Sequence, residues 1–367
     1  MKLVFSKSDL NKAVGIVMKA VPTRTTMNIL ECILIDATTN EIKFTGNDME
    51  LGIETIVEGE IIEKGKIAID AKLFSEIVRK LPDNDITLTT DSNNNALITC
   101  EKSKFNIAGK SGDDFSYLPA IIKDKMITLS QFQLKEVINQ TIFSIAINDN
   151  NKMMTGELFE VNEGTLKVVG LDGHRIAIRN FNLEGRADDV KVVVPGKTLQ
   201  EISKILSTDA ENMVNVYFTN NHILFEFDNT TVVSRLIEGE YFKINQMLSS
   251  DYGTKVVINK KEFIDSIDRA NLLIKEGEKK PIIINITDGS LEVNVNSAIG
   301  TLNEDIDIEK EGKDLMIGFN PKFLLDALRV IDDETVDIYL VNPKAPCFIR
   351  DKEQSYIYLI LPVNFTA

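Results

Sequence analysis

The pattern of hydrophobic and polar positions along the chain repeats three times. Three segments each read as a short apolar strand, a polar cap and an amphipathic helix, and their lysines recur at a constant spacing of 125 residues. The segments are residues 66–81, 191–206 and 316–331. A fixed period is typical of repeat architectures, so the pattern predicts three copies of one fold unit.

Each copy also opens with a strand and an amphipathic helix, near residues 3–10, 127–134 and 256–263. A strand pair is predicted after each second helix: 86–90 with 96–100, 214–219 with 222–227, and 336–340 with 347–350. The predicted order is β-α-β-β-β-β-α-β-β. Because strands far outnumber helices, we expect an α+β fold in which two helices per copy pack on antiparallel sheets. The predicted domains are residues 1–122, 123–250 and 251–367.

The net charge of −15 argues against binding of nucleic acid through bulk positive charge, but it leaves room for a local basic face. On each second helix two basic residues lie seven positions apart and therefore share one side. These residues are Lys72, Arg79, Lys197, Lys204, Lys322 and Arg329. One interpretation is a basic row that contacts a phosphate backbone. The other is a solvated face, in which Glu76, Glu201 and Asp326 pair with the bases locally.

The sequence gives little support for catalysis. It has only two histidines, and His174 has no recognisable nucleophile near it, while His222 follows a turn. The cysteines, Cys32, Cys100 and Cys347, are far apart, which argues against a disulfide framework or a zinc site. We therefore expect no catalytic residue, metal or cofactor. With no signal peptide and no apolar segment long enough to span a bilayer, we expect a cytoplasmic protein.

The last strand predicted, Tyr356–Val363, is nearly all apolar and ends near Pro362. Proline cannot extend a ladder, so the chain leaves the sheet there. One interpretation is that this end of the chain forms a groove for a partner's short hydrophobic peptide. The alternative is a buried strand that closes a sheet.

Several separate motifs accompany the three repeats. They are Asp172-Gly-His-Arg175, Gly112-Asp-Asp-Phe-Ser-Tyr-Leu-Pro119, Gly318-Phe-Asn320 and Leu361-Pro-Val363. Together, and over the whole chain, they resemble the bacterial DNA polymerase III beta subunit family, the sliding clamps. The resemblance implies three DNA-clamp domains per chain and a head-to-tail homodimer that forms a six-domain ring. Its helices would line the hole around duplex DNA. Such a protein is a processivity factor and has no catalytic activity of its own.

The resemblance also implies site residues. The partner-peptide groove would contain Met154, Leu171, Gly173, His174, Arg175, Ile176, Phe242, Met247, Asn320, Phe323, Pro346, Leu359, Leu361, Pro362 and Val363. His174, Arg175 and Asn320 would orient the peptide. Arg24 would join the basic row in facing DNA. The dimer interface would include Lys104, Phe105, Ile107, Leu272 and Leu273.

The implied partners are encircled duplex DNA, the DNA polymerase III alpha subunit, the clamp loader, other DNA polymerases and repair factors, and a second copy of the chain. Departures from the family pattern occur at Gln246, Lys279, Ile147–Lys152 and the tail Asn364–Ala367. One alternative function is a triplicated scaffold that binds proteins through the same groove without encircling DNA. Another is a hydrolase that uses His174.

Overall fold

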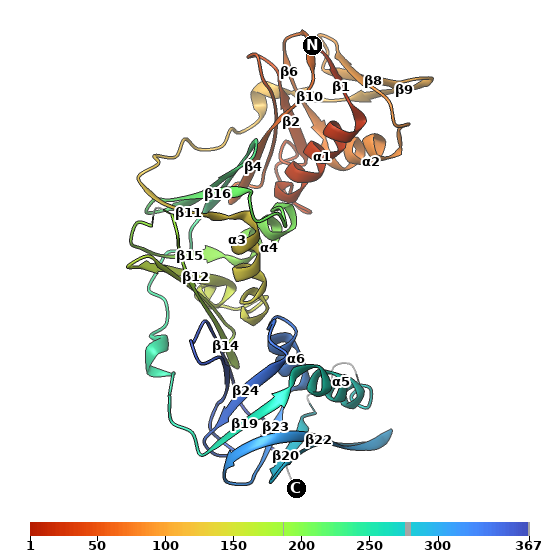
Figure 1. Ribbon diagram of the computed structural model, residues 1–367. Coiled ribbons are helices and arrows are strands. Elements are labelled where there is room, and N and C mark those ends of the chain that lie inside the picture. Colours follow the sequence, from red (N-terminus) through yellow and green to blue (C-terminus); the bar gives the residue numbers. More distant parts are fainter. Residues whose placement is uncertain (186, 276–279, 366–367) are drawn as a thin grey trace. The chain divides into compact units, whose positions relative to one another are not determined.

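The computed structural model describes residues 1–185, 187–275 and 280–365, which fall into two compact units (Figure 1). The first unit contains Met1–Lys135, Glu184–Asp188 and Lys197–Leu236. The second contains Glu136–Leu183, Asp189–Gly196 and Ile237–Ala367. Lys279 and the last two residues of the tail, 366–367, lie outside the described residues. No helix in the described ranges combines the length and the apolar character that crossing a membrane requires.

The first repeat alternates sheet and helix as the sequence pattern predicts, with two additional short strands, β5 and β10. Its elements are β1 (Lys2–Phe5), α1 (Lys7–Val17), β2 (Cys32–Asp36), β3 (Ile42–Asn47), β4 (Leu51–Val57), β5 (Glu60–Glu63), β6 (Lys66–Asp70), α2 (Ala71–Lys80), β7 (Ile86–Thr90), β8 (Asn95–Cys100), β9 (Ser103–Ala108) and β10 (Lys110–Ser111). Asp70 caps α2, because its side chain accepts a hydrogen bond from the Leu73 amide at 2.7 Å. Phe74, Ile77 and Val78 form the buried stripe of this helix.

The second and third repeats share one element order. The second contains β11 (Lys125–Ser130), α3 (Gln131–Asn139), β12 (Gly156–Asn162), β13 (Thr165–Leu171), β14 (Arg175–Asn182), β15 (Val190–Pro195), α4 (Gly196–Ile205), β16 (Met213–Phe218), β17 (His222–Phe227) and β18 (Thr230–Arg235). The third contains β19 (Thr254–Asn259), α5 (Lys260–Asn271), β20 (Ile282–Thr287), β21 (Ser290–Ser297), β22 (Gly300–Gly312), β23 (Leu315–Phe319), α6 (Pro321–Leu328), β24 (Thr335–Leu340), β25 (Cys347–Arg350) and β26 (Tyr356–Ile360).

The predicted element order was wrong about the strands after each second helix, where two were expected: three follow α4 and α6, and four follow α2 if the short β10 is counted. The strands omitted from that order are β9, β18 and β26, of which β26 was expected separately and β9 was implied by the resemblance as an edge strand around residues 104–107. β9 is largely exposed and polar, and only two residues separate β17 from β18. β9 therefore lacks a buried face, whereas β18, whose Val232 and Val233 are buried, is separated from the strand before it by too short a turn to be told apart in the sequence.

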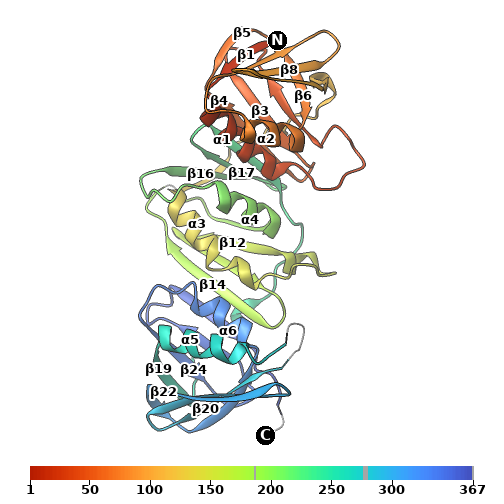
Figure 2. The same cartoon turned by 90° about the vertical axis from the view of Figure 1, so that its right-hand side faces the viewer.

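The strands form three antiparallel sheets. In the first unit the strand orders are β5-β1-β7-β8-β9 and β10-β6-β2-β3-β4-β18-β17-β16-β11. In the second unit a single sheet has the order β15-β12-β13-β14-β26-β25-β24-β19-β22-β21-β20-β23. Figure 2 shows α1 beside α2 in the first unit and α5 beside α6 in the second, and each pair is in contact. Helices thus pack on antiparallel sheets, as the α+β prediction requires.

Two pairings join one repeat to the next. β4 pairs with β18, with Leu51 opposite Ser234, and β14 pairs with β26, with Arg175 opposite Ile360. In both, the third strand after a repeat's first helix pairs with the final strand of the following repeat. Two strands of these kinds remain. The first part of β22 is the third strand after α5, and β9 is the first repeat's equivalent of β18 and β26. Among the described residues, positions 300–307 of β22 pair only with β21, and β9 is a sheet edge.

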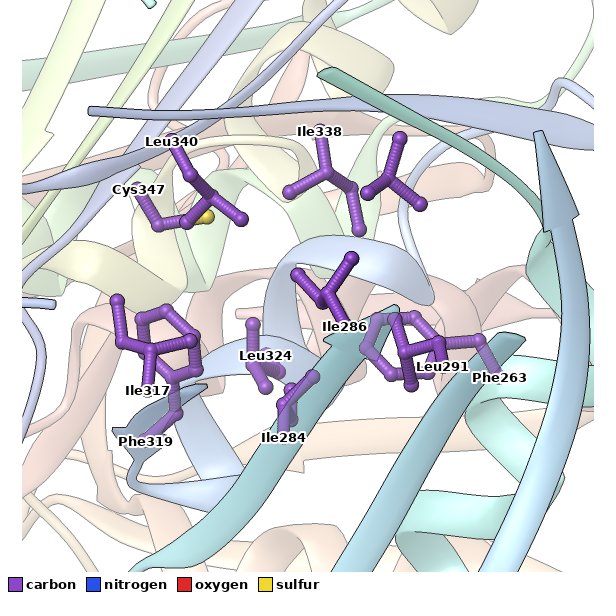
Figure 3. Close-up of a pocket in the computed structure, with 11 residues that line it drawn as sticks. Phe263, Ile284, Ile286, Leu291, Ile317, Phe319, Leu324, Ile338, Leu340 and Cys347 are labelled. Atoms are coloured by element: carbon purple, nitrogen blue, oxygen red, sulfur yellow. The ribbon is translucent and has the colours of Figure 1, made fainter. Parts of the chain in front are cut away.

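A small cavity lies inside the core of the third repeat (Figure 3). Its lining is apolar and comes from the helices and strands on both sides of that core: Val256, Phe263, Ile284, Ile286, Leu291, Ile317, Phe319, Leu324, Ile338, Leu340 and Cys347. Burial raises the pKa of the Cys347 thiol to about 12, so this sulfur stays protonated and unreactive at neutral pH. All of these residues belong to the buried core, and we interpret the cavity as a packing gap.

Candidate functional site

The turn between β13 and β14 carries the Asp-Gly-His-Arg motif. The Asp172 carboxylate accepts hydrogen bonds from the amides of His174 (3.0 Å) and Arg175 (3.2 Å). Gly173 has φ of +83°, a backbone conformation that glycine adopts without strain. The His174 carbonyl accepts a hydrogen bond from the Leu361 amide at 2.9 Å. The motif therefore forms a rigid turn that is fastened to the C-terminal segment.

Arg175 lies beneath this turn and is only 6 % exposed. Its guanidinium pairs with Asp172 at 3.0 Å and with Asp326 at 2.7 Å, and it donates to the Phe143 carbonyl. It also lies 4.4 Å from the centroid of the Phe323 ring. We expected Arg175 to orient a peptide, but these contacts occupy its guanidinium within the chain. Neither Asp172 nor Asp326 was predicted as a partner of this residue.

The apolar residues expected in the groove divide into buried and exposed members. Leu171, Ile176 and Leu359 are buried in one cluster, and Met154 and Phe242 pack against it half-buried. Strand β26 is buried along its whole length, as the closing-strand interpretation predicts. Exposure begins immediately after it, at Leu361 (36 %), and Met247 is 49 % exposed. The closing-strand interpretation describes β26 itself, and the groove interpretation stays a prediction for the exposed residues after it.

The remaining groove candidates lie at the start of α6, just before β25 and in the tail. The Asn320 side chain caps α6 by accepting a hydrogen bond from the Lys322 amide at 3.0 Å, so its oxygen is already engaged. The Val363 amide donates to the Gly318 carbonyl at 2.8 Å, which holds the tail against β23. Pro346 and Pro362 are half-buried.

The two histidines do not form catalytic arrangements. The His174 ring is exposed and stacks on Phe323, with centroids 6.1 Å apart and 23° between the ring planes. The His222 amide donates to the Thr219 hydroxyl at 3.0 Å in a hairpin turn. Burial and the nearby Arg235 lower the pKa of His222. In the ranges that the structure describes, no group of His, Cys, Asp and Glu side chains is placed to hold a metal ion.

All six members of the basic row are exposed on their helices, and Arg24 is exposed in the loop after α1. Four of the six have an acidic partner. Lys204 pairs with Glu201 at 2.7 Å, Lys322 with Asp326 at 3.0 Å and Arg329 with Asp268 at 2.8 Å, and Lys197 pairs with Asp48. Lys72 and Arg79 have no ion pair within the described residues. Local pairing, the alternative interpretation, therefore applies to part of the row.

The residues expected at the dimer interface lie at free edges. Lys104, Phe105 and Ile107 are on the edge strand β9, and Phe105 is 39 % exposed. Leu272 follows α5 and is 77 % exposed. Leu273 is half-buried and packs close to Gly300, at the start of β22. Apolar side chains and unpaired backbone thus occur together at two places, as they do at surfaces that associate.

Comparison with known proteins agrees with this architecture. Three families match in order: the N-terminal domain of the DNA polymerase III beta subunit at residues 1–119, its central domain at 128–243 and its C-terminal domain at 245–364. The beta sliding clamp of Staphylococcus aureus is 36% identical over 358 residues, which are 95% of each chain.

Solved structures are similar over their full length. A putative DNA polymerase III beta subunit from Eubacterium rectale has 69% identity and a TM-score of 0.97, with 100% of both chains covered. The DNA polymerase sliding clamp of Bacillus subtilis has 33% identity and a TM-score of 0.96, again with 100% of both chains covered. The chain therefore belongs to the DNA polymerase III beta subunit family.

Proposed function

We propose that this chain is a DNA sliding clamp, a non-catalytic processivity factor that closes into a ring as a head-to-tail homodimer and tethers DNA polymerase III to duplex DNA. The observation that carries the proposal is the pair of equivalent joints, β4 with β18 and β14 with β26. A third joint of the same kind requires β22 and β9. In a head-to-tail dimer, each copy's β22 would pair with the β9 of the other copy.

The internal repeat specifies the register of this third joint. The hairpin turns before β4, β14 and β22 are equivalent. In each, a side-chain oxygen of the first turn residue accepts a hydrogen bond from the backbone amide two residues later. The first turn residues are Asp48, Asp172 and Ser297. Matching the strand registers of the first two repeats makes Ile107 the equivalent of Ser234. Because Leu51 lies opposite Ser234, we expect Gly300 opposite Ile107 of the second copy. In the same register we expect Leu302 opposite Phe105 of the second copy.

The basic row supports sequence-independent contact with DNA. With a net charge of −15, most of the surface repels a duplex, and exposed lysines and arginines would attract phosphates locally. Exposed ion pairs contribute little free energy, so phosphates can compete for the four paired residues. Lys72 and Arg79 have no acidic partner among the residues that the structure describes, so phosphates would meet no such competition there. We propose that these side chains, with Arg24, face the DNA.

A second surface would bind protein partners. We define the peptide surface as Met154, Leu171, His174, Ile176, Phe242, Phe323, Leu359 and Leu361. Its buried leucines and isoleucine supply an apolar floor, and His174, Phe323 and Leu361 lie at the accessible side. An apolar floor with few polar groups suits a short hydrophobic peptide. We propose that the polymerase alpha subunit, the clamp loader, other polymerases and repair factors bind here.

Retention on circular DNA tests the proposal. The protein would be loaded onto nicked circular duplex by the clamp loader of the same organism with ATP, isolated by gel filtration, and the circle then cut. We expect stable retention on the circle and rapid loss after linearisation. As a control, Phe105→Glu places a charge at the proposed third joint and should abolish retention. Equal retention on circular and linear DNA would contradict encirclement, and failure to load would favour the scaffold alternative.

A further inference from the structure

Asp326 lies on α6, and one of its carboxylate oxygens has two basic partners. Oδ2 pairs with the Arg175 guanidinium at 2.7 Å and with the Lys322 ammonium group at 3.0 Å. The two partners differ in exposure, because the Arg175 side chain is 6 % exposed and that of Lys322 is 70 % exposed. Removing one member of a buried ion pair leaves the other charge buried and unpaired, whereas water solvates the charge that is left when an exposed pair is broken. The Arg175 contact is therefore the one with structural consequences.

The guanidinium of Arg175 in turn supports an aromatic side chain. It lies 4.4 Å from the centroid of the Phe323 ring and 5.4 Å from that of Phe143. Phe323 stacks with His174. A continuous series of contacts thus leads from Asp326 through Arg175 and Phe323 to His174. Asp326 and His174, the first and last residues of this series, both lie in the second unit. His174 belongs to the exposed part of the peptide surface.

We propose that Asp326 is a positioning residue for peptide recognition, an inference that rests on the proposed peptide surface. Its carboxylate fixes the Arg175 guanidinium under Phe323, so that the Phe323 ring is held in place for an incoming apolar side chain. Asp172 still pairs with Arg175 when Asp326 is changed, so the turn keeps its own anchor. The loss of Asp326 is therefore expected to affect the position of Phe323 more than the fold.

The test is the affinity for a fluorescein-labelled peptide from the C-terminal tail of the same organism's DNA polymerase III alpha subunit, measured by fluorescence anisotropy on the full-length protein. Asp326→Asn, which keeps the shape and removes the charge, should weaken binding about tenfold. Asp268→Asn is the control, because the same substitution there removes the acid of an exposed ion pair, and it should change the affinity less than about twofold.

A double-mutant cycle separates positioning from general destabilisation. In a Phe323→Ala background, Asp326→Asn should have almost no further effect on peptide affinity, because the ring that it positions is gone. If Asp326→Asn does not fold, as judged by native mass and thermal melting, Asp326→Glu keeps the charge but displaces it, and should bind the peptide about threefold more weakly.

Three results would overturn the inference. Equal affinities of the wild type and Asp326→Asn would do so, and so would an equal loss of affinity in both Phe323 backgrounds. If the wild-type protein does not bind the peptide at all, the proposed peptide surface fails, and this inference fails with it. That last result is distinguishable, because retention on circular DNA does not depend on this peptide.

Discussion

The buried carboxyl group of Glu157 is expected to make the stability of the second unit depend on pH. This glutamate lies on β12 and is 0 % exposed. Burial raises the pKa of its carboxyl group to about 8, against a smaller opposing effect of the Thr141 hydroxyl. The nearby Tyr241 is buried as well, and its hydroxyl donates to the Val169 carbonyl at 3.1 Å. Glu157 therefore carries its proton in the folded protein at neutral pH.

The sign of the effect follows from proton binding in the two states. In the unfolded chain the pKa of a glutamate is about 4.5, so between about pH 4.5 and 8 the folded state holds a proton that the unfolded state has released. The stability that this proton contributes is complete below about pH 4.5 and is lost as the pH rises through about 8. Within this window the free energy of unfolding falls by about 1.4 kcal/mol per pH unit, or on the order of 2–3 kcal/mol from pH 6 to pH 8.

Glu157→Gln removes the titrating group and keeps the shape of the side chain. We expect the variant to lose this decline and to become more stable relative to the wild type as the pH rises. The measurement is urea unfolding at pH 6, 7 and 8, at one fixed protein concentration because dimer dissociation makes the midpoint concentration-dependent. Glu160→Gln, on the same strand but with its partly exposed side chain paired with Lys191, is the control and should follow the wild type. Parallel slopes for Glu157→Gln and the wild type would refute the reasoning.

Three further predictions concern the proposed ring. At the first joint Lys197 pairs with Asp48, and the equivalent positions at the proposed third joint are Lys72 and Ser297. Ser297→Asp should therefore give Lys72 of the second copy an acidic partner and slow subunit dissociation about two- to fivefold in a subunit-exchange assay. Unchanged exchange would contradict the equivalence of the two joints. Asn106→Cys combined with Thr301→Cys should form an intersubunit disulfide under mild oxidation, visible as a dimer on a non-reducing gel, and each single variant should stay monomeric there. Lys72→Glu with Arg79→Glu should shorten retention on circular DNA most at low salt and leave the native mass unchanged, whereas unaltered retention would assign this pair to a solvated face.

The sequence predicted the three repeats and the α+β class, because those features depend on periodic apolar positions that any single segment shows. It did not predict the role of Arg175. The partner of that residue, Asp326, is 151 positions away, and only the pairing of β14 with β26 brings the two together. Strand β9 was absent from the predicted order because it lies at the edge of its sheet with most of its residues exposed, so it lacks the buried alternation that marks the other strands.

The three joints are equivalent in backbone but differ in charge, and this difference bears on where a ring would open. At the first joint Lys197 pairs with Asp48, and at the second the buried Arg175 pairs with Asp326. At the third, the position of Asp48 is occupied by Ser297, whose hydroxyl is already bonded to the Gly300 carbonyl at 3.1 Å. In the proposed dimer, the subunit joint would lack such an ion pair and would depend more on strand pairing and on apolar side chains such as that of Leu272. Apolar contacts between exposed residues separate without leaving a buried charge unpaired, whereas the second joint cannot open without doing so. We therefore expect both joints within a chain to stay closed under forces that open the joint between chains.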